Sequence, residues 1–185
     1  MKNNIVKIPK SITIFYNHTK NLLILKGPLD QKSLKLNIKI IILKSKIKIT
    51  SIPLIKISNN KIKTLKSIQK TTITRIKQLL IETKSITYKK LNIVGIGLKV
   101  LSVNNFNNKL LSFRLGSSHN IYYKIQKKIN IFCLKSTKLF IFSNSFQEVS
   151  QTAAQIRMNK LPNPYKIKGI LYADESVTIK KGKKI

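Results

Sequence analysis

The spacing of hydrophobic residues changes twice along this chain, and the order of those changes limits the folds that the chain can adopt. Alternating or short apolar stretches predict strands at residues 11–16, 22–26, 34–42, 46–50, 91–100, 110–116, 120–125 and 138–143. Apolar residues at helical spacing predict one helix over residues 60–84 and a second that begins at Ser145. Several strands followed by one helix, twice over, predict an α+β protein.

The repeated order predicts two duplicated small domains, each an antiparallel sheet covered by one helix. We expect an N-terminal domain at residues 1–87, a C-terminal domain at 88–160, and an extended basic arm at 161–185 that continues the second domain. Each half has a glycine at the end of a predicted strand, Gly27 in "LKGPL" and Gly116 in "FRLGS". These matching landmarks support the duplication.

Local signals place the ends of the two predicted helices. Asn59 or Asn60 is a suitable N-cap for the first helix. Ser145 and Glu148 have the spacing of a capping box at the start of the second. The second helix should end before Pro162, because a residue that precedes proline is disfavoured in the helical region.

Several residues of the second half belong to residue types that can form chemical sites. The "GIG" at residues 95–97 lacks the third glycine of a dinucleotide-binding fingerprint, since Val100 stands there, so we expect glycines within a strand. Residues 104–108, "NNFNN", predict a turn. Cys133 is the only cysteine, which excludes an internal disulfide and a cysteine zinc site, and we expect it to be a small buried residue.

The charge balance is extreme, with 37 Lys and Arg residues against 5 Asp and Glu and a net charge of +32. Self-repulsion at this charge opposes compaction, so we expect a partner that supplies negative charge. Nucleic acid is the densest source, with one phosphate charge per ~1.7 Å of duplex. So few carboxylates argue against a metal site or an acid–base pair, and we expect neither enzyme activity nor a cofactor.

Composition and hydropathy also suggest where the protein works. The chain has 32 Ile and 17 Asn but only 3 Ala. Because Ile and Asn have A/T-rich codons, this composition indicates an A/T-biased genome, such as that of an organelle or a parasite. Its apolar runs are far shorter than the roughly 18 residues of a membrane span, so we expect no membrane insertion. The first residues, "MKNNIVKIPK", resemble neither a signal peptide nor a transit peptide. We therefore expect synthesis in the compartment where the protein acts.

The segment "NPYKIKGILYADE" at residues 163–175 combines prolines, tyrosines and lysines. Pro162 and Pro164 favour extended backbone before them, which lowers the entropy of the segment. The rings of Tyr165 and Tyr172 can stack or pack against a nucleotide. A solvated tail is the alternative interpretation, but a spacer does not require aromatic residues. We therefore expect an arm that docks on nucleic acid.

Glycine and acidic residues complete this segment. Gly169 would let backbone approach the nucleic acid closely, and Asp174 and Glu175 are interpreted as partners of nearby lysines. The last residues, "TIKKGKKI", add four lysines within six positions. These lysines can meet phosphates as point charges.

The residues quoted above resemble the C-terminal signature of the sixth large-subunit ribosomal protein family of bacterial type. The matching positions are Pro162, Pro164, Tyr165, Lys166, Lys168, Gly169, Ile170, Tyr172 and Glu175. "TAAQIR" at 152–157, "VGIGLKV" at 94–100 and "LGSSHN" at 115–120 are also similar to family segments, as are "VKIPKSITI" and "LKGP" near the start. The resemblance covers nearly the whole chain in order.

The resemblance implies a non-enzymatic constituent of the large ribosomal subunit. Such a protein would bind large-subunit rRNA beside the sarcin–ricin stem-loop, near the docking site of translational GTPases and in contact with neighbouring ribosomal proteins. The residues that we expect to contact rRNA are Arg114, Ser117, Ser118, His119, Arg157, Lys160, Asn163, Tyr165, Lys166, Lys168, Gly169, Tyr172, Lys180, Lys181, Lys183 and Lys184. Arg157 has an alternative role, which is to brace the arm against the second helix.

Two turns depart from the family pattern, and two other classes of function remain open. Asp30 stands where the family usually has a glycine, and Asn120 replaces the proline that follows His119. A non-ribosomal organellar DNA-packaging protein and a peripheral protein of an anionic membrane are the alternatives. The A/T bias fits an organellar gene, and we favour the mitochondrion over the plastid.

Overall fold

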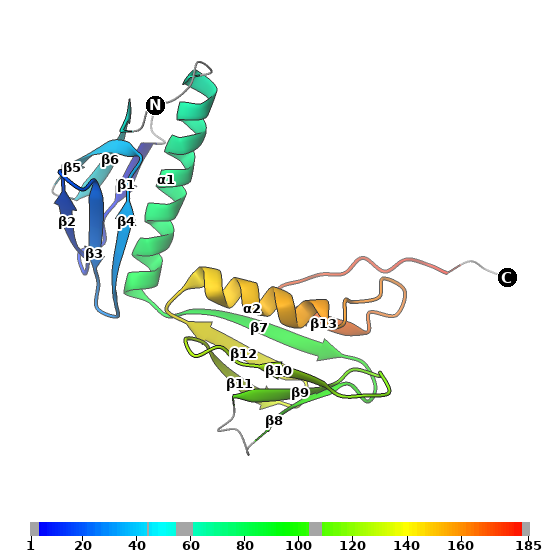
Figure 1. Ribbon diagram of the computed structural model, residues 1–185. Coiled ribbons are helices and arrows are strands. Elements are labelled where there is room, and N and C mark those ends of the chain that lie inside the picture. Colours follow the sequence, from blue (N-terminus) through cyan, green and yellow to red (C-terminus); the bar gives the residue numbers. More distant parts are fainter. Residues whose placement is uncertain (1–3, 44, 55–60, 104–108, 183–185) are drawn as a thin grey trace. The chain divides into compact units, whose positions relative to one another are not determined.

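The computed structural model describes residues 4–43, 45–54, 61–103 and 109–182, and the chain divides into two compact units, residues 1–86 and 87–185 (Figure 1). Unit 1 contains β1 (Ile5–Lys7), β2 (Thr13–Asn17), β3 (Leu22–Lys26), β4 (Gln31–Lys35), β5 (Ile38–Leu43), β6 (Lys46–Pro53) and α1 (Lys61–Lys84). Unit 2 contains β7 (Thr87–Val94), β8 (Lys99–Ser102), β9 (Leu110–Arg114), β10 (Ile121–Lys124), β11 (Asn130–Lys135), β12 (Lys138–Ser143), α2 (Phe146–Met158) and β13 (Gly169–Tyr172). The expected N-cap at Asn59 or Asn60 and the expected turn at 104–108 lie outside the described residues.

The two units repeat one strand order. Unit 1 has the sheets β5-β6-β1 and β2-β3-β4, and unit 2 has the sheets β11-β12-β7-β13 and β8-β9-β10, all with antiparallel neighbours. When the strand numbers of unit 1 are raised by six, both of its sheets reappear in unit 2. The predicted α+β fold of two duplicated domains is confirmed, but each unit divides its strands between two sheets where the sequence predicted one.

The division into two sheets explains why two predicted strands were wrong. The predicted strand 34–42 is broken between β4 and β5, because the amide of Leu36 donates to the carbonyl of Asn21 while the carbonyl of Asn37 accepts from Leu54, each at 2.9 Å. The chain therefore crosses from one sheet to the other at this point. The predicted strand 91–100 is likewise broken by a turn at Gly95–Gly97, where Gly97 has a φ of +75°.

The core of unit 1 lies between its strands and α1. Ile73, Ile76 and Leu80 on α1 are buried, as their helical spacing predicts. They belong to one cluster with residues of both sheets: Val6, Ile12, Leu23, Leu25, Leu36, Ile38, Ile40, Ile47 and Ile49. Ile42, which alternation places on the same side of β5 as Ile38 and Ile40, is 38% exposed because it lies near the end of the strand.

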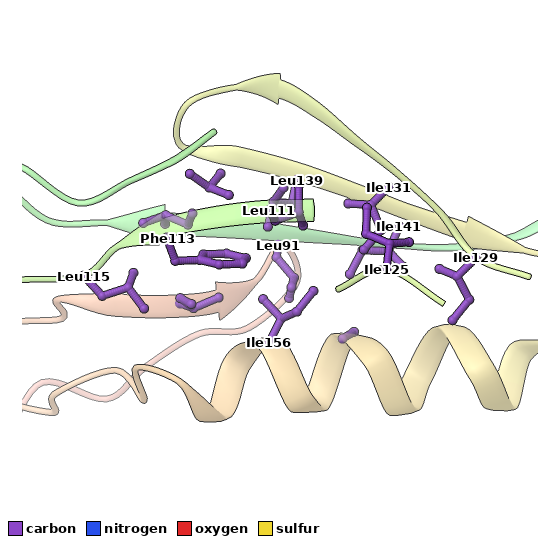
Figure 2. Packing of buried hydrophobic residues seen from close by; sticks show 14 of the residues in the cluster. Leu91, Leu111, Phe113, Leu115, Ile125, Ile129, Ile131, Leu139, Ile141 and Ile156 are labelled. Carbon is purple, nitrogen blue, oxygen red and sulfur yellow. The ribbon is translucent and has the colours of Figure 1, made fainter. Parts of the chain in front are cut away.

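The core of unit 2 lies between its sheets and α2 (Figure 2). Val149, Ala153 and Ile156 form the buried stripe of α2, as predicted. The predicted capping box is wrong: Ser145 precedes the helix, but its side chain makes no capping hydrogen bond. Cys133 is only partly buried against this core, and that burial raises the pKa of its thiol.

Gly27 has a structural role in unit 1. A Cβ at this position would lie 2.4 Å from the carbonyl oxygen of Thr83 at the end of α1, closer than real contacts allow. The same oxygen accepts a hydrogen bond from the amide of Leu29 at 3.3 Å. Asp30, which departs from the family pattern, closes this turn, because its carbonyl accepts from Gly27 at 3.1 Å and its side chain accepts from the amide of Gln31 at 2.8 Å. The absence of a side chain at Gly27 lets the turn pack on the helix.

We predict that Gly27→Ala lowers the free energy of unfolding of unit 1 by about 1–3 kcal/mol, because the new methyl group overpacks against helix backbone. Urea titration followed by circular dichroism measures the change. Gly182→Ala is the matched control, because no atom lies within 4 Å of the position its Cβ would take. Equal stability of the two variants would show that α1 moves away at little cost.

Candidate nucleic-acid interface

The strand pairing of unit 2 brings three turns that are distant in sequence to one end of the unit. Val94, at the end of β7, is opposite Gly169 at the start of β13. Arg114, at the end of β9, is opposite Lys99 at the start of β8. The turn after β7, the turn after β9 and the loop before β13 therefore lie at the same end (Figure 1). We call this surface the basic end, formed by residues 94–99, 114–120 and 160–169.

Leu98 packs against two of the three turns, and Lys168 of the third lies beside Gly95. Its side chain is 9% exposed, and its Cδ1 would lie 2.7 Å from a Cβ on Gly95. Its Cδ2 would lie 3.8 Å from a Cβ on Gly116, in the second turn. The Cβ of Lys168, in the third, would lie 3.5 Å from the same Cβ on Gly95. Gly95 and Gly116 have φ of +140° and +79°, conformations that side chains disfavour, so glycine is required for both turns.

Most of the sequence-predicted contact residues lie at the basic end with their side chains exposed. They are Arg114, Ser117, Ser118, His119, Lys160, Asn163, Tyr165, Lys166 and Lys168. Lys99 is exposed opposite Arg114, and sequence analysis missed it because only the pairing of β8 with β9 places it there. The three turns contain no Asp or Glu. The basic end therefore presents cations that have no carboxylate beside them in the same turns.

The loop at residues 160–169 has an internal hydrogen-bond frame. The amide of Ile167 donates to the carbonyl of Asn163 at 2.7 Å, and the amide of Asn163 donates to the carbonyl of Lys168 at 3.1 Å. The side chain of Asn163 accepts from the amide of Tyr165 at 2.8 Å. These bonds fix the backbone that supports the lysines, so binding an anion there needs little further ordering.

Gly169 has a different role from the one expected. It is buried with a φ of +151°, and a Cβ there would lie 2.7 Å from the carbonyl oxygen of Leu161 and 2.8 Å from Pro162. The close approach that glycine permits is therefore to the chain's own backbone. It allows β13 to start directly beneath the loop.

The segment predicted as one extended arm forms part of the fold. Ile170 and Leu171 of β13 are buried, and the amide of Ile170 donates to the carbonyl of Lys160 at 2.9 Å. Farther along, the amide of Lys180 donates to the carbonyl of Pro164 at 3.1 Å, so the tail returns to the loop. Lys180 and Lys181 are exposed, whereas Lys183 and Lys184 lie outside the described residues.

Arg157 braces the C-terminal segment against α2, the alternative role raised for it above. Its Nε donates to Oε2 of Glu175 at 3.1 Å and its Nη2 donates to Oε1 at 2.5 Å. Oε2 also accepts from the amide of Tyr172 at 3.1 Å. The partner of Glu175 is thus this arginine and not a lysine as expected. The hydrogen bonds from Arg157 lower the pKa of Glu175 and raise that of the guanidinium.

The ring of Tyr172 is occupied within the unit. It is partly buried against the core, with Lys89 Nζ 4.7 Å and Arg157 Cζ 5.4 Å from the ring centroid. These cations stack on the electron-rich ring faces. Tyr165, by contrast, is 56% exposed and remains open to a ligand.

Among the described residues, no group of three or more His, Cys, Asp and Glu side chains could hold a metal ion. Within the same residues, neither helix is long and apolar enough to cross a membrane.

We predict that Glu175→Gln lowers the free energy of unfolding of unit 2 by about 1 kcal/mol at pH 7, because the charge-assisted bonds to Arg157 are weakened. Since folding depresses the pKa of Glu175, its stabilisation is complete above about pH 5 and is lost as the pH falls through the folded-state pKa. Urea titrations at pH 7 and pH 3 should therefore show a larger difference from the unsubstituted protein at pH 7 than at pH 3.

Asp174→Asn is the control, because it removes the same charge from the neighbouring, exposed position. A pH-independent difference for Glu175→Gln would contradict the electrostatic origin of the effect.

Comparison with known proteins identifies relatives over the whole chain. The sequence model of the family described as Ribosomal protein L6 matches residues 94–173. The large ribosomal subunit protein uL6 of Mycoplasmoides gallisepticum is 33% identical over 98% of this chain and 94% of its own length. The uL6 of Mycoplasma pneumoniae is 34% identical over 90% of this chain and 87% of its own. The uL6 of Rhodopseudomonas palustris is 43% identical over 96 residues, 52% of each chain.

Proposed function

Because the chain belongs to the uL6 family of large ribosomal subunit proteins, we propose that the basic end of unit 2 binds the rRNA of that subunit. The observation that supports this proposal is the meeting of three carboxylate-free turns around Gly95 and Leu98, with their lysines and arginine exposed. Phosphates would neutralise these side chains, which reduces the repulsion within a chain of net charge +32.

The basic end would recognise the shape and backbone of the RNA. A-form RNA hides the base edges of its deep major groove, so a rigid surface of point charges selects phosphate positions more readily than sequence. The hydrogen-bonded frame of residues 160–169 holds Lys166 and Lys168 in place for such a role. Tyr165 can pack on a sugar or a base beside them.

We place this contact beside the sarcin–ricin stem-loop, near the site of translational GTPases and in contact with neighbouring ribosomal proteins. The match of Pro162, Pro164, Tyr165 and the residues that follow to the family signature supports this position. The A/T-biased composition supports an organellar ribosome, and we propose the mitochondrial one.

We predict that the pair Lys166→Glu and Lys168→Glu lowers the occupancy of the protein in purified large subunits at least several-fold, because two positive charges that face rRNA phosphates become negative. Both side chains are exposed, so the fold should persist. Quantitative mass spectrometry of the subunits measures the occupancy.

The control pair, Lys20→Glu and Lys26→Glu, makes the same charge change at exposed positions of unit 1. We expect this pair to retain the occupancy of the unsubstituted protein. Equal loss in both pairs would indicate a general charge effect, and unchanged occupancy of the first pair would refute the role of the loop.

The cellular assignment has its own test. We predict that the tagged protein from lysed mitochondria sediments with the large subunit in a magnesium-containing gradient. Sedimentation with DNA would support the DNA-packaging alternative, and recovery from plastids alone would overturn the mitochondrial assignment.

A further inference from the structure

The four-stranded sheet of unit 2 has one face on the core and one face on solvent. Leu91, Ile131, Leu139 and Ile141 are buried on the side that faces α2 (Figure 2). Because side chains alternate along a strand, the residues between them point away from the core. The outward residues of β7, β11 and β12 include four aromatic side chains, Tyr88, Phe132, Phe140 and Phe142.

These four rings form one connected row across three strands. The ring centroids of Phe132 and Phe142 are 5.2 Å apart, those of Phe142 and Phe140 are 5.6 Å apart, and those of Phe140 and Tyr88 are 5.2 Å apart. The register explains the row, since Phe132 is opposite Phe140 and Phe142 is opposite Tyr88. The rings at the two ends are the most open, with Phe132 59% and Tyr88 58% exposed.

The row lies among cations. Lys90 Nζ is 5.6 Å from the ring centroid of Tyr88 and 5.9 Å from that of Phe140. Lys138 is exposed and lies two residues before Phe140 in β12, so its side chain points outward in the same direction. The three strands contain no Asp or Glu. The face therefore combines flat apolar rings with lysines, and its strands contain no carboxylate that could neutralise the positive charge.

We propose that this aromatic face binds an unpaired stretch of RNA, with bases stacked on Phe132 and Tyr88 and phosphates near Lys90 and Lys138. The choice of RNA as ligand rests on the proposed function. An apolar protein surface would bury the ammonium group of Lys90 without a counter-ion, which is costly. RNA supplies base faces for the rings and phosphates for the lysines at the same time.

The spacing of the rings agrees with a short RNA segment. Phe132 and Tyr88 lie on strands separated by β12, and the register offsets them by two residues, because Phe132 is opposite Phe140 and Phe140 is opposite Lys90. At the usual ~4.8 Å between strands and ~3.4 Å per residue, their backbones are about 12 Å apart. Aromatic side chains on four-stranded sheets stack two or three bases over such a span. The binding mode differs from that of the basic end, because stacking depends on the bases whereas phosphate neutralisation does not.

The experiment uses the full protein and an eight-nucleotide unpaired RNA, compared with an oligonucleotide of the same length that has abasic riboses. Fluorescence anisotropy at 150 and 500 mM NaCl measures both dissociation constants. We expect the RNA with bases to bind more tightly than the abasic one at both salt concentrations, because salt weakens the phosphate contacts of both oligonucleotides alike while base stacking remains. Equal dissociation constants for the two oligonucleotides would overturn the proposal.

The variant pair Phe132→Leu and Tyr88→Leu keeps the face apolar and removes its two open rings. We expect it to weaken binding of the RNA with bases by about 10- to 100-fold and to leave abasic binding unchanged. The matched control, Phe15→Leu with Tyr122→Leu, removes one phenylalanine and one tyrosine that are 58% and 62% exposed elsewhere. Equal affinities of the two variant pairs would contradict the assignment.

A second measurement does not depend on the stability of these variants. The substitution Phe132→p-benzoylphenylalanine introduces a photoreactive side chain, which is irradiated in purified large subunits. An RNA adduct supports the proposal, and an adduct with another protein shows that the face is a protein interface and overturns it. Either result leaves the test of Lys166 and Lys168 unaffected, so failure of this inference is distinguishable from failure of the proposed function.

Discussion

Electrostatic repulsion among 37 Lys and Arg side chains opposes the folding of this chain, which has only 5 carboxylates to offset it. Two of those carboxylates form ion pairs that link distant segments: Glu82 of α1 with Lys32 of β4, and Glu175 with Arg157 of α2. Both pairs are largely shielded from solvent, so they are screened less than surface pairs. The excess positive charge remains on exposed lysines, and a bound polyanion would stabilise the folded state by mass action.

Duplication produced two units with one strand order, and among the described residues β13 of unit 2 has no counterpart in unit 1. β1 lies at an edge of its sheet in unit 1, whereas its counterpart β7 is paired with β13 in unit 2. That pairing fixes the loop at 160–169, because β13 begins at Gly169 where the loop ends. The buried side chains of Ile170 and Leu171 thus anchor the segment that presents the lysines.

The basic end and the aromatic face offer RNA two kinds of contact on one unit. The basic end combines a rigid loop with exposed cations, which suits the backbone of a folded RNA. The aromatic face has open rings beside Lys90, which suits bases that are free of pairing. The two surfaces would therefore respond differently to salt and to the removal of bases.

Both helices and most of the strands, in their order, were determined by sequence alone, because the spacing of apolar residues is a local property; β1 and β13 were not predicted as strands. The stretch 138–143 became β12 without change, and the helix expected over 60–84 became α1. The family signature also selected Lys166 and Lys168, although their RNA contacts remain predictions. Only the tertiary structure decided where the chain crosses between sheets at residues 36 and 37, that Arg157 binds Glu175, and that Gly169 packs on Leu161. It also decided that four aromatic residues on three strands share one exposed row. These features depend on which strands are neighbours and in what register, and that information lies in contacts between residues far apart in the chain.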